Sequence, residues 1–366
     1  MPSASDVRVA RFTRYDVGTV AAVVVLAAAI VLFPSVAPNA YILSVGVTVI
    51  SYAVLATSWN FVGGFTGYIS LGHAAYSGVG GYATALLITR RDVDPWLALV
   101  LGALIVAVLS IPIGIASLRV RGASFVIVSI ALVLILLLVF QAWGSFTGGS
   151  NGLRVPRPFP PSVLRPAQHE RFFYIHGIVL GVVLFVWWLF DRSRFGTGLK
   201  AIREDEDKAQ ALGVPTFTYK LVAFVTSAFF TAIGGGLYAL WFGNLDPIFQ
   251  FSILTGAYMV LMSLLGGLRS LFGPLLGAIV VGVAVEYFKS EYGDSQFHLV
   301  AMGVLLAVIV LFMPDGIIPA VAGWAGRFRP QATSIREQTQ ADLAASRDTT
   351  GTDSAMGAAD REAVLR

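Results

Sequence analysis

Long apolar stretches separated by short polar ones dominate the chain. Runs of roughly 20 apolar residues, the length that a helix needs to cross a bilayer, recur from near the N-terminus to about residue 314. The pattern predicts ten membrane-spanning helices at residues 17–36, 40–60, 64–88, 96–117, 123–143, 173–190, 220–242, 252–268, 273–289 and 297–314. The predicted fold is therefore an all-α, polytopic membrane protein with one transmembrane domain, residues 17–314.

The segments outside this domain differ in character. Residues 1–16 carry three arginines before the first apolar run. This arrangement is also typical of a signal peptide, but the run is long and no clear cleavage site follows it. Residues 315–330 are expected to lie along the inner membrane interface. Residues 331–366 have little apolar mass and are predicted to be disordered.

Composition narrows the classes of function. The chain is 56% hydrophobic and 13% charged, with a mean hydropathy of +0.77, whereas soluble domains carry roughly 25% charged residues. It has no cysteine, its four histidines are not paired at ligand spacing, and it has no phosphate-binding P-loop motif. We therefore expect no metal site, no cofactor, no nucleic-acid partner and no ATP hydrolysis by this chain.

The distribution of lysine and arginine predicts an orientation. With the N-terminus in the cytoplasm, 18 of the 25 basic residues fall in segments on the inner side. Cytoplasmic loops carry an excess of such residues. Both termini are therefore predicted to be cytoplasmic, and residues 191–219 form the most charged inner loop.

Ionisable side chains are scarce within the predicted spans, where only His73 and Glu286 stand out. Ion-coupled carriers usually need buried carboxylates or histidines. Glu286 lies near the outer end of its span, within reach of Lys289, and we interpret it as structural. His73 is interpreted as a neutral hydrogen-bonding residue. Transport by this chain would then need an outside energy source, such as a partner ATPase.

Residues 58–85, SWNFVGGFTGYISLGHAAYSGVGGYATA, are apolar yet contain seven glycines. Unpaired backbone is not tolerated against lipid, so an interrupted helix here must pack inside protein or line a path. The candidate pathway residues are Gly67, Ser70, Gly72, His73, Tyr76 and Gly78. The alternative is a tightly packed helix whose glycines only admit close neighbours.

Within the loop 191–219, apolar residues recur at helical spacing at Leu199, Ile202, Ala209 and Leu212. Gly213 is a suitable helix cap, and Pro215 prevents continuation. The pattern predicts a helix of about four turns outside the membrane, with an apolar stripe suited to a groove on a partner protein. A solvated connector is the alternative.

Several motifs occur in an order that resembles one transporter family. They are the glycine-rich segment 58–85, RVRGASFVIVSI (119–130), FTGGSNGL (146–153), AIREDEDKAQALGV (201–214) and MSLLGGLRSLFGPLLGA (262–278). Together they resemble the LivM-like permease subunits of bacterial ABC importers for branched-chain amino acids. Each motif is weak alone, and their order makes the resemblance specific.

The resemblance assigns roles to two groups of residues. Residues 201–214 are similar to the EAA loop, whose short helix inserts into a cleft of the ATPase subunit. The implied contacts are Ile202, Arg203, Glu204, Glu206, Ala209, Leu212 and Gly213, and the chain departs from the family pattern at Lys208. Gly266, Gly267, Gly273 and Pro274 correspond to a second glycine-rich motif, which breaks the helix between spans eight and nine.

The resemblance also implies an assembly. The chain would be a non-enzymatic permease subunit in the bacterial inner membrane. Its implied partners are a related second permease subunit, two ATP-binding ABC subunits, a soluble external substrate-binding protein and the lipid bilayer. Separately, the ten predicted spans divide as five plus five, and a repeat of five spans would place the two halves in opposite orientation.

Other functions stay open from the residues alone. Urea or a short amide is an alternative substrate to branched-chain or other hydrophobic amino acids, since helix ends and glycine backbone bind either kind without charged side chains. A stand-alone ion-coupled carrier or channel is a further alternative. An intramembrane enzyme finds no support, because the sequence offers no catalytic or metal-binding cluster.

Overall fold

The computed structural model describes residues 4–160 and 162–293, together with residues 300, 303, 304, 307 and 316–318. The long helices are α1 (Ala4–Val36), α2 (Ala40–Thr66), α3 (His73–Arg91), α4 (Pro95–Ser117), α5 (Ala123–Ala142), α7 (Arg165–Arg192), α10 (Thr216–Phe242), α12 (Ile253–Gly266) and α13 (Gly273–Tyr292). The shorter elements are α6 (Gly144–Thr147), η1 (Gly149–Asn151), α8 (Arg194–Glu204), α9 (Glu206–Ala211), α11 (Pro247–Gln250), β1 (Leu153–Arg154) and β2 (Asn244–Leu245).

The predicted all-α polytopic membrane fold is confirmed. Within the described residues, eight helices are long and apolar enough to cross a membrane, with α11 and α12 counted together. Helix α3 is long enough, but its glycines and polar residues lower its mean hydropathy. The predicted span 297–314, most of the segment 315–330 and the whole tail 331–366 lie outside the described residues. The count of ten spans and the inverted halves therefore stay predictions.

Two predicted boundaries are wrong. The span predicted at 64–88 instead forms α3 over His73–Arg91, because α2 extends to Thr66 and ends at Gly67, which adopts φ +75 and donates its N–H to Gly63 O. This left-handed conformation favours glycine and ends helices. Helix α7 begins at Arg165, eight residues before the predicted start of the span 173–190. Pro166 lies in the first turn, where proline is tolerated.

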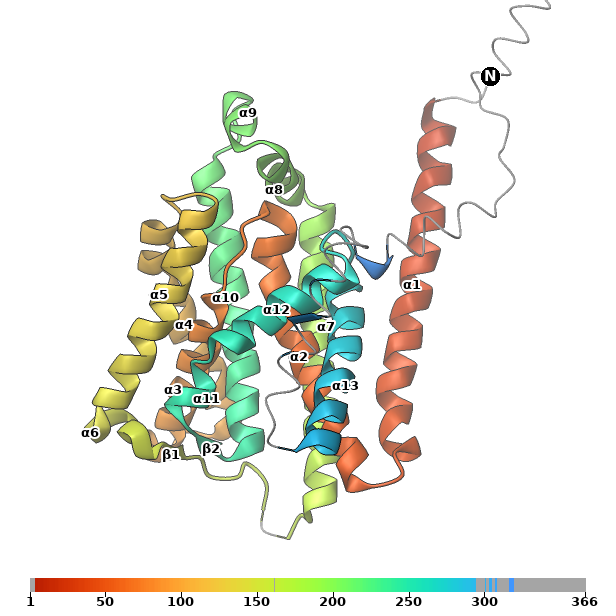
Figure 1. Ribbon diagram of the computed structural model, residues 1–366. Helices are drawn as coiled ribbons and strands as arrows, with labels where there is room; N and C mark the ends of the chain where they lie inside the picture. The colour runs from red at the N-terminus through yellow and green to blue at the C-terminus, as the bar shows by residue number, and fades with distance from the viewer. Residues whose placement is uncertain are drawn as a thin grey trace, which may run out of the picture. The chain divides into compact units, whose positions relative to one another are not determined.

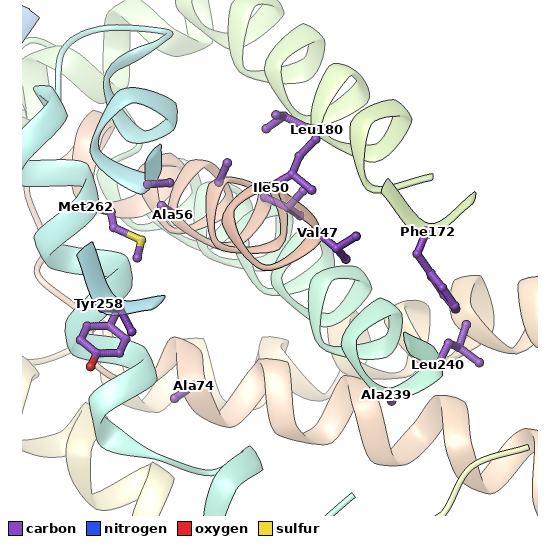
Figure 2. Packing of buried hydrophobic residues seen from close by; sticks show 14 of the residues in the cluster. Val47, Ile50, Ala56, Ala74, Phe172, Leu180, Ala239, Leu240, Tyr258 and Met262 are labelled. Atoms are coloured by element: carbon purple, nitrogen blue, oxygen red, sulfur yellow. The ribbon is translucent and has the colours of Figure 1, made fainter. Parts of the chain in front are cut away.

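Helices α2 and α10 form the centre of the described fold. α10 packs against α2, α3 and α4, and α2 packs also against α7, α12 and α13. Figure 2 shows part of the apolar core between them, with Val47 and Ile50 of α2 close to Leu180 of α7. Small residues bring α3 and α10 close together, since a Cβ on Gly235 would lie 2.0 Å from Ser77 O. This close packing fixes the frame around the glycine-rich segment.

The short elements lie at opposite ends of the long helices (Figure 1). α8 and α9 lie at one end, and α6, β1 and β2 lie at the other. Strands β1 and β2 are antiparallel, with Leu153 opposite Leu245 and Arg154 opposite Asn244. The pairing joins the segment after α5 to the segment after α10. Helix α1 packs along α7, where Phe33 and Phe173 stack with ring centroids 5.0 Å apart.

Candidate functional site

Residues 67–72 connect α2 to α3 without helical structure, and we call them the α2–α3 linker. Side chains from other elements satisfy its backbone. Trp59 Nε1 donates to Ser70 O at 2.6 Å, and Leu71 N donates to Ser129 Oγ at 3.1 Å. Buried backbone groups need such partners. The helix interruption that the glycines predicted is therefore present, and it packs inside the protein.

The linker borders a cavity of about 320 Å³ between α3, α4 and α5. Ser70, Gly72 and Tyr76 line it, so three of the six predicted pathway residues share one cavity. Ser117, Ser129 and several apolar side chains, among them Phe125 and Phe224, complete the walls. None of the lining residues is Asp, Glu, Lys, Arg or His. The cavity therefore offers hydroxyl groups and apolar surface, the chemistry of a site for an uncharged or largely apolar group.

The other three predicted pathway residues lie elsewhere. Gly67 is the end of α2, and Gly78 packs against Phe251, whose ring would lie 2.5 Å from an added Cβ. His73 is buried, with Nε2 2.7 Å from Ser227 Oγ, and Ser227 Oγ donates to Ser58 O at 2.6 Å. Because the serine hydroxyl donates to a carbonyl, it accepts from the imidazole, which places the proton on Nε2. His73 thus joins α3 to α10 and, through Ser227, to α2.

The α8–α9 loop, residues 194–213, is not the single four-turn helix that was predicted. The backbone breaks at Asp205, which has φ −163 and ψ 110. Asp205 Oδ1 accepts hydrogen bonds from the N–H groups of Asp207 and Lys208 at 3.1 and 3.0 Å and so caps α9. The N–H of Lys208 and its ammonium group lower the pKa of Asp205. A local cap thus divides the predicted helix in two.

Most of the predicted apolar stripe faces the chain's own helices. Leu199, Ile202 and Ala209 are buried in a cluster that includes Phe61, Phe65, Val183, Trp187 and Phe230. These three side chains are therefore not available to a groove on a partner, which corrects the reason given for docking. Leu212, by contrast, is 84% exposed.

Gly213 ends α9 as the sequence predicted. It has φ +85, its N–H bonds Gln210 O at 2.9 Å, and the next N–H, from Val214, bonds Ala209 O at 3.1 Å. This pair of bonds is the Schellman arrangement, in which glycine is favoured because the backbone is left-handed. Its function as an ATPase contact stays a prediction.

Glu206 lies at the centre of a polar cluster between the α8–α9 loop and the membrane helices. Its carboxylate accepts from Lys220 Nζ at 2.5 Å and from Tyr68 OH at 2.8 Å, and Arg121 Nη2 lies 3.3 Å away. The Lys220 side chain is 3% exposed and that of Glu206 11%. Lys220 Nζ also donates to Tyr68 OH at 3.0 Å. A buried ion pair needs such additional bonds to balance its lost hydration.

The surroundings of Tyr68 keep its hydroxyl group protonated. Burial, followed by its hydrogen bond to Glu206, raises the pKa of Tyr68. Arg121 also pairs with Asp207 at 2.9 Å, and that hydrogen bond together with Glu206 raises the pKa of Arg121. Tyr68 and Arg121 therefore keep their protons over the ordinary pH range.

Arg203 makes a second contact between the α8–α9 loop and α2. Its Nη1 donates to Gly64 O at 2.6 Å, in the last turn of the helix, where a cation is favoured. Partial burial lowers the pKa of Arg203. Glu204, in contrast, points into solvent and pairs with Arg269 at 3.2 Å. Two adjacent residues thus face opposite directions.

The second predicted break is present between α12 and α13. α12 ends at Gly266, Gly267 has φ +113, and α13 begins at Gly273 with Pro274 in its first turn. A Cβ on Gly266 would lie 1.6 Å from Gly273 O, so the two helix ends meet through backbone. The assignment of these four residues to breaking and packing agrees with this geometry.

Comparison with known proteins places the chain in a family. Residues 41–313 match the family described as "Branched-chain amino acid transport system / permease component". The match spans more than half of the chain. The chain belongs to this family.

Individual proteins that are similar to this permease are also named as permeases. The "High-affinity branched-chain amino acid transport system permease protein LivM" of Salmonella typhimurium is 28% identical over 291 residues, which cover 73% of the chain and 68% of the relative. LivH of the same organism is 27% identical over 290 residues, which cover 75% of the chain and 93% of LivH. The "Galactose/methyl galactoside import permease protein MglC" of Salmonella typhimurium is also similar, with 27% identity over 147 residues. These cover 38% of the chain and 44% of MglC. The similarity thus extends across permeases named for different substrates.

The polar cluster of this permease contains residues that sequence reasoning missed. Lys220 and Tyr68 were assigned no role, and Arg121 appeared only within the motif at residues 119–130. A lysine at the start of an apolar span is itself a signal, because such a charge needs a partner. The identity of that partner depends on folding, since Tyr68 and Glu206 are 138 positions apart.

Proposed function

We propose that the chain is one membrane subunit of an ATP-driven importer for branched-chain or other hydrophobic amino acids. The family match over residues 41–313 carries this proposal. LivM and LivH are named as permease proteins of one transport system, which supports a related second permease as partner. Two ATP-binding subunits and an external substrate-binding protein complete the proposed assembly. The chain itself forms part of the pathway and leaves ATP hydrolysis to its partners.

We place the α8–α9 end in the cytoplasm. Arg192, Arg194, Lys200 and Lys208 gather there, in keeping with the excess of basic residues in cytoplasmic loops. The proposed ATPase contact is the outer surface of α9. It consists of Asp207, Lys208, Gln210, Ala211, Leu212 and Gly213, which are exposed. Leu212 is its apolar anchor, because an exposed leucine among polar residues is suited to a pocket on a partner.

A reconstituted assembly tests the function. The chain, its second permease and the ATP-binding subunits are placed in liposomes with ATP inside and the binding protein outside. We expect ATP-dependent uptake of labelled leucine and no uptake by the chain alone. Uptake by the chain alone, driven by a proton or sodium gradient, would establish a carrier instead. ATP-driven uptake of urea but not leucine would keep the importer and replace its substrate.

A matched pair of leucine variants tests the ATPase contact. Leu212→Asp should reduce co-purification of the ATP-binding subunits by about tenfold or more, the loss expected when a central apolar anchor is removed. Leu164→Asp is the control, since Leu164 is 76% exposed and lies in the segment between β1 and α7. If both variants retain the ATP-binding subunits equally well, Leu212 is not the contact.

A further inference from the structure

The α8–α9 loop contacts the start of the α2–α3 linker from both sides. Arg203 donates to Gly64 O at 2.6 Å, and Glu206 accepts from Tyr68 OH at 2.8 Å. Gly67 lies between these two contacts and holds the left-handed turn with which the linker begins. The loop therefore constrains the chain immediately before and immediately after the point where α2 ends.

Glu206 bonds side chains from three different parts of the fold. One carboxylate is bonded to Lys220 on α10, to Tyr68 on the linker and to Arg121 in the turn between α4 and α5. Lys220 Nζ also lies 4.8 Å from the centre of the Tyr68 ring, over its face. Removing one member leaves a buried charge or hydroxyl without its partner, which is unfavourable. Glu206 and its neighbours are therefore expected to move together.

Only three residues separate Tyr68 from Gly72, and two of the residues in this stretch line the cavity. Ser70 and Gly72 belong to its wall, together with Ser129, which bonds the linker backbone at Leu71 N. Movement of Tyr68 is therefore expected to move the cavity wall, because Ser70 and Gly72 follow Tyr68 closely along the same linker. The linker is the shortest covalent path from the α8–α9 loop contacts to that cavity.

We propose that Glu206, Lys220 and Tyr68 form a latch that couples the position of the α8–α9 loop to the conformation of the α2–α3 linker. The proposal rests on the proposed importer function. The three residues are positioning residues: they transmit movement of α9 to the cavity wall and do not touch the ATP-binding subunit. The outer surface of α9 carries the partner contact, and its inner surface carries the latch.

A neighbouring ion pair at the same end of the fold provides a contrast. Asp191 and Lys200 are 2.6 Å apart, and their side chains are 37% and 51% exposed. Exposed pairs contribute little, because solvent screens them. Asp191→Asn makes the same carboxylate-to-amide change as Glu206→Gln without affecting the latch. It is the matched control.

The test measures leucine uptake and ATP hydrolysis together in the reconstituted assembly. For Tyr68→Phe and Glu206→Gln we expect assembly and ATP hydrolysis to be retained within about twofold. Leucine transported per ATP should fall by about fivefold or more, the lower end of typical coupling between sites. Asp191→Asn should keep the wild-type ratio. A merely structural role would lower both rates in proportion and leave this ratio unchanged.

Tyr68→Phe keeps the proposal testable even if Glu206→Gln does not assemble, because it removes a single hydroxyl and no charge. A wild-type ratio in assembled Tyr68→Phe would overturn the latch, whether or not both rates had fallen. Absence of ATP-driven uptake in the wild-type assembly would overturn the proposed function and the latch with it. A fall in the ratio for Tyr68→Phe, with a wild-type ratio for Asp191→Asn, would support the latch.

Discussion

Two interruptions of six residues each lie within the described part of the chain, at 67–72 between α2 and α3 and at 267–272 between α12 and α13. The second interruption satisfies much of its backbone locally, and Asn60 Nδ2 of α2 also donates to Leu268 O at 3.2 Å. Gly267 N bonds Ser263 O, Ser270 N bonds Gly267 O, and Gly273 N bonds Ser270 O, each at 3.1 to 3.2 Å. The first relies more on side chains. Trp59 of the preceding helix and Ser129 of α5 bond its backbone, and Glu206 accepts from the Tyr68 hydroxyl.

This difference separates a closed turn from an adjustable connection. The second interruption is closely packed through its glycines, since a Cβ on Gly266 or Gly273 would collide with a carbonyl oxygen. Such close packing leaves little room for a second arrangement. A segment held by side chains on other helices changes when those helices shift. We therefore expect the first interruption to respond more strongly to the α8–α9 loop, which contacts the second through the exposed pair of Glu204 and Arg269. We expect the second to fix the helix ends.

The largest expected effect is at the closed turn. Gly266→Ala places a Cβ about where Gly273 O lies, and neither backbone can yield. We expect the yield of folded protein from membranes to fall about tenfold, with a clearly lower Tm. Gly181→Ala in α7 is the control, because nothing lies within 4 Å of its added Cβ. Equal yields for the two variants would contradict a rigid turn.

At the adjustable connection, function should suffer more than folding. Gly72→Leu adds side-chain atoms beside Ser129, where even a Cβ would lie 3.1 Å from the carbonyl oxygen. We expect leucine uptake to fall by about tenfold or more, with a smaller loss of Tm than for Gly266→Ala. The measurement combines uptake in liposomes with thermal unfolding of the purified chain. A variant that is as unstable as Gly266→Ala would remove the contrast between the two interruptions.

Two arginine variants compare the strength of the contacts that the α8–α9 loop makes near each interruption. Arg203→Ala removes a half-buried, charged hydrogen bond to Gly64 O and should lower the free energy of unfolding by about 1 to 2 kcal/mol. Arg269→Ala removes an exposed pair with Glu204 and should lower it by less than about 0.5 kcal/mol. Denaturant unfolding of the two variants checks the order. The reverse order would place the stronger hold on the second interruption.

The smallest expected effect concerns His73, the first residue of α3 after the linker. His73→Ala should lower uptake less than Gly72→Leu, because the alanine leaves space and the glycine change adds a collision. The pH profile of uptake between about pH 5 and 8 should keep its shape, since the neutral imidazole donates to Ser227. A flattened or shifted profile would show that His73 titrates during transport and would revive the proton-coupled carrier.

Local signals in the sequence predicted the frame of this structure. Apolar run length predicted most helices to within a few residues, and glycine predicted both interruptions and the end of α9 at Gly213. These features depend on neighbours along the chain, through backbone conformation and hydropathy. The same signals did not predict the corner at Asp205, where a capping carboxylate overrides the helical pattern of the residues around it.

The direction in which a side chain faces was not predictable. The stripe of Leu199, Ile202 and Ala209 indicated an amphipathic helix, but the same pattern is produced whether a helix packs on its own protein or on a partner. Glu206 was expected on the partner side, yet Lys220 and Tyr68 draw it inward. Contacts between residues so far apart in sequence arise only when the helices have assembled.

The pairing of β1 with β2 has a consequence for the order of assembly. Leu153 and Leu245 are 92 positions apart, so β1 has no partner until α7 and α10 have been made. At typical synthesis rates that interval is roughly 5 to 20 s. The segment after α5 therefore waits, unpaired, while two long helices enter the membrane. We therefore expect β1 and β2 to pair only after α10 has been made, late in the assembly of the described fold.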